Sequence, residues 1–195
     1  MQTPAPPDLC IRPARPDERL PLYRMLELYQ HDLSDIWDQD LDAHGDYGYA
    51  LDKYGGSGSS SAGHLAFVFQ VAGCYAGFAL VDARDLPPAG AGLVGASNSA
   101  PGHWMAQFFV LRKYRRRGVG HAAAGQLFTA LPGRWQVGQM PLNAPAQAFW
   151  RRVISAYTHG DFVECRIDSG AWQGVLQSFD SAPTAGLTSA KRATV

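Results

Sequence analysis

Apolar residues in the first part of the chain follow a helical period and then lose it. Residues 9–12 could form a short first strand. Apolar positions then recur about every 3.6 residues and predict an amphipathic helix over residues 17–35: Leu22, Met25, Leu26, Leu28, Tyr29 and Leu33. The periodicity fades over residues 37–54, and residues 55–63 are almost wholly glycine and serine. We therefore expect a mobile loop over residues 55–63.

The middle of the chain has the composition of β-strands. Residues 64–72 and 75–82 are rich in Phe, Val, Leu and Ala and are separated by Gly73, which predicts an antiparallel hairpin. Residues 86–102 are rich in proline and glycine and predict a long surface connection. Residues 104–111 then form a strongly apolar segment, which predicts a further strand.

Helices and strands alternate in the last part of the chain. The pattern predicts helices over residues 118–131 and 144–157, and strands over 134–140, 162–167 and 172–179. Residues 181–195 are small, polar and aperiodic, so we expect a disordered tail, and we expect residues 1–8 to be flexible. Residues 9–180 are then one α/β domain with a mixed sheet.

Composition agrees with a single folded domain and narrows the function. The chain has 195 residues, 46% of them hydrophobic and 17% charged, which is enough for one well-buried core. Its formal net charge is zero, so overall charge gives the protein no attraction to nucleic acid or to an anionic membrane. Three cysteines match neither a zinc site nor a disulfide framework, and no apolar run reaches membrane-spanning length. We expect a cytoplasmic protein that needs no metal.

A basic turn carries the candidate chemistry. The apolar strand that ends at Leu111 is followed by the run Arg115-Arg116-Arg117-Gly118-Val119-Gly120 and then by a helix. A strand that leads through a glycine-containing turn into a helix directs free backbone N–H groups and the positive end of the helix dipole at one point. Gly118 and Gly120 allow close approach, and arginines add charge-assisted hydrogen bonds. A pyrophosphate is the expected ligand, although the turn matches neither a nucleotide P-loop nor the dinucleotide fingerprint.

These residues resemble the GNAT family of acetyltransferases. Residues 115–120 match its R/Q-x-x-G-x-G/A pattern, and residues 143–150 look like its N-x-x-A-x-x-apolar-aromatic helix start. The resemblance implies a GNAT-like fold: a central, mostly antiparallel sheet with a parallel strand-helix-strand unit at the site for coenzyme A (CoA), flanked by helices. It also implies acetyl-CoA as the acetyl donor.

The resemblance assigns the CoA contacts residue by residue. Backbone N–H groups of the turn would bind the pyrophosphate, the backbone of the preceding strand would pair with pantetheine, and two residues of the later motif would lie beside the pantetheine arm. The residues concerned are Arg115, Arg116, Arg117, Gly118, Val119 and Gly120 for the turn, Phe109, Val110 and Leu111 for the strand, and Asn143 and Phe149 for the later motif.

Two positions depart from the family pattern and concern catalysis. Gln107 stands where relatives often have a glutamate as general base, and a carboxamide takes no proton at neutral pH. Trp150 stands where many relatives have a tyrosine that protonates the departing thiolate. Tyr157, about two turns further along the predicted helix, is a candidate substitute. Deprotonation of the amine could run through water toward Asp32 or Glu164.

The acceptor is predicted to be a cationic amine on a small molecule or peptide. In this family the segment after the first helix often lines the acceptor side, and here it holds seven aspartates between Asp32 and Asp52, with Tyr29 on the helix before it. Carboxylates would hold an amine and tyrosine faces would offer cation–π contact. The alternative interpretation is a solvated acidic loop.

The resulting hypothesis is an N-acetyltransferase that transfers acetyl directly to a primary amine within one ternary complex. The departures at Gln107 and Trp150 keep open a CoA-binding regulatory or partner module without catalysis. Zero net charge and the lack of interleaved aromatic residues argue against specific nucleic-acid binding by Arg112 to Arg117. The sequence leaves a homodimer open and predicts no membrane partner.

Overall fold

The computed structural model describes residues 4–54, 63–87, 99–169 and 172–181. The predicted mobile loop over residues 55–63 lies outside the described residues except for Gly63, and so does most of the connection over 86–102. Residues 1–3 of the predicted flexible terminus and all but Ser181 of the predicted tail also lie outside them.

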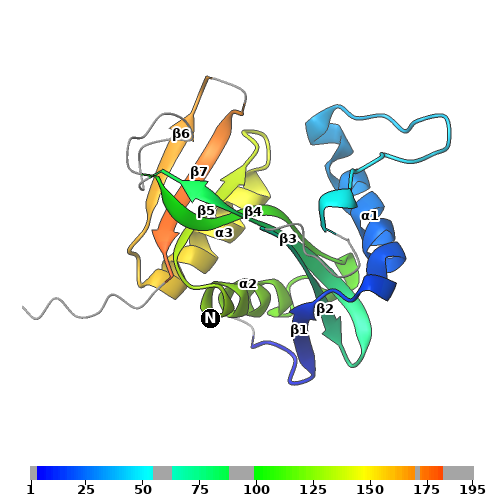
Figure 1. Cartoon of the computed structure of the whole chain (residues 1–195), viewed down its shortest axis with the longest axis horizontal. Helices are drawn as coiled ribbons and strands as arrows, with labels where there is room; N and C mark the ends of the chain where they lie inside the picture. The colour runs from blue at the N-terminus through cyan, green and yellow to red at the C-terminus, as the bar shows by residue number, and fades with distance from the viewer. Residues whose placement is uncertain (1–3, 55–62, 88–98, 170–171, 182–195) are drawn as a thin grey trace, which may run out of the picture.

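Seven strands form one mixed sheet in the order β1-β2-β3-β4-β5-β7-β6 (Figure 1). Every neighbouring pair is antiparallel except β4 and β5, which are parallel. The predicted α/β fold with a mixed sheet is therefore confirmed. The strands are β1 (Leu9–Pro13), β2 (His64–Val71), β3 (Cys74–Leu86), β4 (Ala100–Val110), β5 (Arg134–Gln139), β6 (Val163–Ile167) and β7 (Gly174–Asp180).

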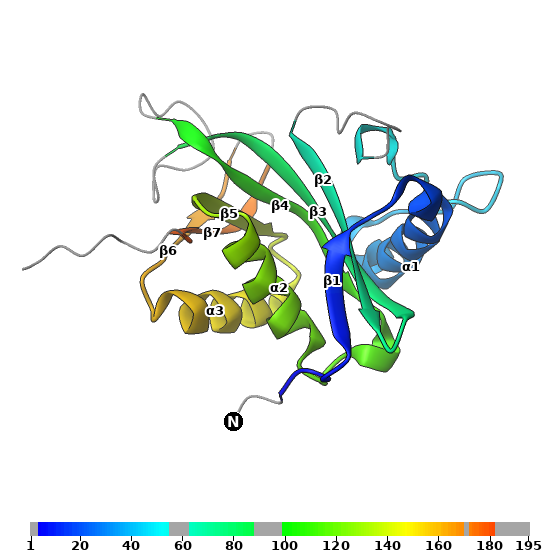
Figure 2. The same ribbon diagram turned by 60° about the horizontal axis from the view of Figure 1, so that its bottom comes forward.

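Three α-helices cover the two faces of the sheet (Figures 1 and 2). Helix α1 (Arg19–Trp37) follows a short 3-10 turn, η1 (Pro16–Glu18), and packs on one face. Helices α2 (Val119–Ala130) and α3 (Ala144–Thr158) pack on the other face, and α2 links the parallel strands β4 and β5. Two further 3-10 turns, η2 (Asp52–Tyr54) and η3 (Arg112–Tyr114), lie after α1 and after β4.

Strand alternation divides the core into two layers. Phe67 and Phe69 of β2 belong to the cluster that contains α2 and α3, whereas Val68 between them belongs to the cluster under α1. Successive side chains of a strand point to opposite faces, so each interior strand supplies both layers. Burial on both faces explains why these strands are almost continuously apolar. A test for alternating apolar and polar residues alone would not have detected them.

A buried ion pair fixes the start of α1 to the edge of the sheet. Glu18 is 1% exposed and accepts bidentate hydrogen bonds of 2.7 Å from Arg12 of β1. It also accepts from the backbone N–H of Arg15 and from the hydroxyl of Tyr75 in β3. The hydrogen bonds from Arg12 outweigh the effect of burial and lower the pKa of Glu18 to about 2. The N-terminus of α1 is thereby held against β1 and β3.

The sheet opens between its two parallel strands. Pairing of β4 with β5 extends only from Gly102–Arg134 to Met105–Val137. Pairing of β4 with β3 continues to Val110, with an irregularity opposite Leu80 and Val81. The last five residues of β4, 106–110, thus keep a strand partner on one side only. This separation places an open backbone edge in the middle of the sheet.

Candidate active site

The opening between β4 and β5 leads into a cleft of about 910 Å³. This volume lies within the range of small-molecule and cofactor sites. Its lining comes from α1, from both separated strands, from the first turns of α2 and α3, and from Trp172 before β7. The cleft therefore reaches both faces of the sheet, and elements far apart in sequence contribute to it.

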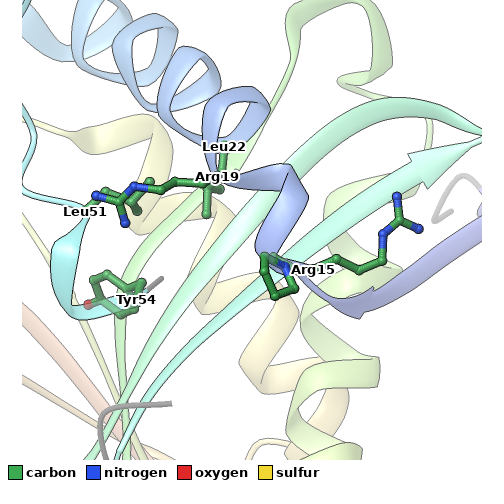
Figure 3. A pocket seen from close by; sticks show the side chains of 7 residues that line it. Arg15, Arg19, Leu22, Leu51 and Tyr54 are labelled. Atoms are coloured by element: carbon green, nitrogen blue, oxygen red, sulfur yellow. The ribbon is translucent and has the colours of Figure 1, made fainter. Parts of the chain in front are cut away.

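A second cavity, beside the first turn of α1, is much smaller. It measures about 70 Å³, which is room for very few waters. Figure 3 shows Arg15 pointing away from Leu51 and Tyr54. The cavity is lined by Ala14, Arg15, Pro16, Arg19, Leu22, Leu51 and Tyr54. Of these two cavities, the cleft at the opening of the sheet is the one with room for a substrate the size of a cofactor.

The basic turn has the backbone shape that an anion site needs. Gly118 is the N-cap of α2 and adopts φ +74°, and Arg116 also lies in the left-handed region at φ +59°. The left-handed region favours glycine, so Gly118 permits the sharp entry into α2. The first N–H groups of a helix have no partner within it and carry the positive end of its dipole. Arg116 and Gly120 line the cleft, whereas Gly118 and the buried Val119 are not part of its lining.

Alternate residues of β4 face the open edge. The N–H of Leu111 donates to Ala76, and the carbonyl oxygen of Phe109 faces β3, 2.1 Å from where a Cβ at Gly77 would lie. Because N–H and C=O groups alternate sides along a strand, those of Phe108 and Val110 face the opening. The predicted pantetheine contacts therefore differ: the backbone of Val110 faces the opening, the carbonyl of Phe109 faces β3, and Leu111, just after β4, donates to Ala76 and accepts from Tyr114.

The start of α3 forms the wall opposite the basic turn. The side chain of Asn143 accepts a 3.1 Å hydrogen bond from the N–H of Ala146 and caps the helix. Phe149 packs one turn further on, and a Cβ added at Gly120 would lie 3.3 Å from its ring. The absence of a side chain at Gly120 thus lets α2 and α3 approach closely beside the cleft. Asn143 and Phe149 both line it, as their motif predicts.

The arginines of the turn have distinct environments. The Nε of Arg115 donates to the carbonyl oxygen of Val110 at 2.7 Å, and its guanidinium also binds Asp32 of α1. Arg112 donates to the other oxygen of Asp32 at 2.6 Å. Arg115 therefore ties the turn to β4 and α1, while Arg116 and Arg117 are exposed. Arg117 does not line the cleft.

The sequence matches the acetyltransferase (GNAT) family over residues 22–154. The chain belongs to the GNAT family. The matched range contains the basic turn, both separated strands and most of α3, which are the elements that build the cleft. GNAT proteins are acyltransferase enzymes that use acetyl-CoA as the acetyl donor, and acetyl transfer is therefore the general activity of this chain. No curated protein matches the chain.

Solved structures show the same fold at low sequence identity. A mutant of the BH1408 protein from Bacillus halodurans superposes with a TM-score of 0.61 at 10% identity, covering 84% of this chain and 97% of that protein. A Corynebacterium glutamicum protein described as histone acetyltransferase HPA2 and related acetyltransferase gives 0.59 at 15% identity, covering 91% and 99%. An acetyltransferase from Thermus thermophilus gives 0.56 at 15% identity, covering 92% and 99%. These likenesses establish the GNAT fold.

Gln107 lines the cleft on the α1 side of the opening, held between two tyrosines. Its Oε1 accepts a 2.5 Å hydrogen bond from the Tyr29 hydroxyl, and its Nε2 donates to the hydroxyl of Tyr49 at 3.3 Å. Burial, together with the neighbouring Tyr49, raises the pKa of Tyr29, so this hydroxyl stays protonated and donates. The Gln107 carboxamide is thus held in place beside Tyr29, the residue predicted from the sequence to bind the acceptor substrate.

The other two candidate catalytic residues lie outside the lining of the cleft. Tyr157 packs against Phe128 and Phe179, and its hydroxyl is 3.3 Å from that of Thr129. Glu164, in β6, accepts two hydrogen bonds from Arg151 and one from Gln177. The hydrogen bonds from Arg151 outweigh burial and lower the pKa of Glu164. Its carboxylate therefore stays ionised, and its negative charge is compensated by Arg151. The structure brings neither residue to Gln107.

Two aspartates of the segment after α1 make contacts within the protein and away from the cleft. Asp42 accepts backbone hydrogen bonds from His44 and Asp46 and shapes a turn, and Asp52 pairs with Arg19. Asp32 and Asp35, which line the cleft, lie within α1 and not after it. Burial acts to raise the pKa of Asp32, but hydrogen bonds from Arg115 and Arg112 prevail and lower it.

The cleft contains three tryptophans that the sequence analysis did not assign to a site. Trp37 is the last residue of α1, Trp104 lies in β4, and Trp172 precedes β7. All three are half-buried and line the cleft. Nothing in their local sequence marks them, because single aromatic residues are usually core and their common destination depends on the sheet opening.

Residues 4–54, 63–87, 99–169 and 172–181 contain no group of three or more His, Cys, Asp or Glu placed to hold a metal ion. Within these same ranges, no helix has both the length and the apolar character needed to cross a bilayer.

Proposed function

We propose that the chain is an acetyl-CoA-dependent N-acetyltransferase that transfers acetyl directly to a primary amine in a ternary complex. The observation that carries this proposal is the single cleft lined by Gly120, Asn143 and Phe149 on one face of the sheet and by Tyr29 and Gln107 on the other. A donor on one face and an acceptor on the other would meet at the open edge of β4. Direct transfer then needs no covalent enzyme intermediate.

The residues present fit CoA. The left-handed N-cap at Gly118 and the N-terminal N–H groups of α2 form an anion site, and Arg116 adds positive charge at the lining of the cleft. A side chain at Gly120 would meet the Phe149 ring, so the glycine keeps the first turn of α2 close to α3 beside the cleft. Bound there, acetyl-CoA supplies the activated acetyl thioester.

The backbone of β4 supplies the proposed electrophilic assistance. The N–H of Val110 faces the opening, where an N–H group can donate to the oxygen that gains negative charge as the amine attacks. This donor is fixed by the pairing of β4 with β3 and needs no rearrangement during the reaction.

The proton of the attacking amine has no carboxylate acceptor at the position of Gln107. A carboxamide can hold the amine by hydrogen bonding but cannot remove its proton. We therefore assign Gln107 a binding role and propose that the amine enters in its neutral form or loses its proton to water. Tyr157 and Glu164 remain predictions from the sequence.

A CoA-binding module without catalysis is the second candidate. Gln107 and the buried Trp150 motivate it, because Trp150 packs in an aromatic cluster with Phe108, Phe128 and Phe149 in place of a hydroxyl. The indole offers only a weak donor to a departing thiolate. Release of free thiol from acetyl-CoA in the presence of amines separates the two candidates.

Binding of CoA is tested by a matched pair of substitutions at Gly118. Aspartate and asparagine have similar shapes and both tolerate left-handed backbone, but only Gly118→Asp places a negative charge at the start of α2. CoA should raise the melting temperature of the wild type and of Gly118→Asn, because ligand binding stabilises the folded state. Gly118→Asp should lose the shift. Equal shifts in both variants would contradict the pyrophosphate assignment.

A further inference from the structure

The α1 side of the cleft is bordered by two aromatic pairs. Tyr29 and Trp37 of α1 make an edge-to-face contact with ring centroids 5.4 Å apart. Trp104 of β4 and Trp172 before β7 make another at 6.0 Å. Met105 belongs to the layer under α2 and α3, so its neighbour Trp104 points to the α1 face, as does Gln107, which bonds Tyr29. Each of the four rings is half-buried and lines the cleft.

Gly138 of β5 lies directly against the rings of the second pair, Trp104 and Trp172. A Cβ at this position would lie 2.7 Å from both the Trp104 and the Trp172 ring, well inside van der Waals contact. The two indoles therefore rest directly on the backbone of β5. Arg84 stacks on the Trp104 ring at 4.3 Å from its centroid and holds it in place. The result is a rigid apolar wall, which costs little conformational entropy when a ligand packs against it.

Charge in the cleft disfavours a polycationic acceptor. The charged residues of its lining are three arginines and two aspartates: Arg112, Arg115, Arg116, Asp32 and Asp35. Asp32 is already paired with two of these arginines. The carboxylates that would have held a second ammonium group are thus outnumbered or occupied, which removes the basis for a polyamine acceptor.

Gln107 offers a polar point for an amine in this lining. A glutamine amide has two lone pairs and two N–H donors, and Gln107 uses one of each on Tyr29 and Tyr49. Its second Oε1 lone pair can accept from an amine N–H beside the open edge of β4. The aromatic pairs then contact whatever extends from that amine.

We infer that the acceptor is a monoamine carrying a flat apolar or aromatic body, with the amine at Gln107 and the body against the rings of Trp37, Trp104 and Trp172. This inference rests on the proposed acetyl transfer. It replaces the cationic acceptor expected from the acidic segment by a ligand held mainly through apolar burial, because the side chains that reach the cleft are aromatic.

Calorimetric titration tests the acceptor class separately from catalysis. 2-Phenylethylamine and 1,4-diaminobutane are each titrated into the free protein and into the CoA-saturated protein. 2-Phenylethylamine should bind about tenfold more tightly, the ratio expected when a phenyl group leaves water. Equal or tighter binding of the diamine, or no binding of 2-phenylethylamine to either form, would overturn the inference. Failure of CoA to bind, or of acetyl-CoA to release the free thiol of CoA with any amine, would instead reject the proposed function.

Two tryptophan variants and one control locate the binding surface. Trp172→Ala should weaken 2-phenylethylamine binding about fivefold or more, while CoA affinity stays within about twofold. Trp37→Ala, at the end of α1, gives the same test at a residue that belongs to neither core cluster. Leu20→Ala removes an exposed apolar side chain of α1 outside the cleft and should change nothing. Wild-type amine affinity in both tryptophan variants would place the body elsewhere and refute the assignment.

Discussion

The carboxylate of Asp32, in α1, accepts a 2.6 Å hydrogen bond from Arg112, in the turn that follows β4. Arg115 binds its second oxygen, so one aspartate joins the helix on the acceptor face to the turn proposed to hold pyrophosphate. The side chain of Arg112 is 75% exposed, and exposed ion pairs contribute little to stability. The position of this contact therefore bears on ligand binding more than on folding.

Asp32→Asn should strengthen CoA binding. The substitution removes a negative charge close to the anion site and frees two guanidinium groups for phosphate, so we expect a two- to fivefold lower Kd for CoA at low salt. The difference should shrink as ionic strength rises, because exposed charges are screened. Calorimetric titration at two salt concentrations measures both effects. Weaker CoA binding by Asp32→Asn would show that the ion pairs shape the turn instead.

Gln107→Glu should preserve or raise acetyl transfer at neutral pH. The hydroxyls of Tyr29 and Tyr49 can both donate to a carboxylate, so the substitution leaves no buried donor without a partner. It also restores a group able to accept the proton of the amine. The measurement is kcat with acetyl-CoA and 2-phenylethylamine between pH 6 and 9.

Gln107→Leu is the matched control for that comparison. Leucine has similar bulk but bonds neither tyrosine, so both stability and transfer should fall. If Gln107→Glu loses turnover while its melting temperature stays at the wild-type value, the carboxamide itself has a role that a carboxylate cannot fill.

Glu18→Gln should destabilise the fold in a pH-dependent way. The folded pKa of about 2 lies below the ordinary value of 4.5, so the ionised carboxylate stabilises the protein fully above pH 4.5. That contribution is lost as the pH falls from about 4.5 toward about 2. We expect a loss of roughly 3 kcal/mol at pH 7 and a smaller difference at pH 3.5.

Urea unfolding of both proteins across this pH range provides the measurement. Asp17→Asn is the control, because Asp17 is a neighbouring acidic residue whose side chain is 72% exposed in its pair with Arg15, and its effect should stay within about 0.5 kcal/mol. A difference between wild type and Glu18→Gln that stays constant with pH would show that packing, and not ionisation, accounts for the loss.

Tyr157→Phe and Glu164→Gln should leave kcat within about twofold of wild type. Tyr157 contacts Thr129 and Glu164 pairs with Arg151, and neither lines the cleft. Steady-state kinetics with the melting temperature as a folding control provides the check. A tenfold fall in kcat in either variant, with its stability retained, would restore that residue to the catalytic assignment made from its sequence position.

The sequence by itself determined the elements and located the basic turn and the helix start that are proposed to bind CoA. Helical periodicity marked α1, α2 and α3, and the apolar runs marked the strands, because local burial patterns follow backbone period. The run from Arg115 to Gly120 was recognisable because its function resides in contiguous backbone: Gly118 has to adopt a left-handed conformation at the start of a helix. Asn143 and Phe149 were found in the same way, within one helix start.

The tertiary structure alone decided the acceptor side. Trp37, Trp104 and Trp172 are separated by more than sixty residues each and line one cleft only because the fold brings α1, β4 and the start of β7 to it. The aspartates after α1 were visible in the sequence, but their partners were not: Asp32 meets Arg112 across eighty residues. Composition shows that charges are present, whereas only the folded geometry fixes which charges neutralise one another and which side chains remain to face a ligand.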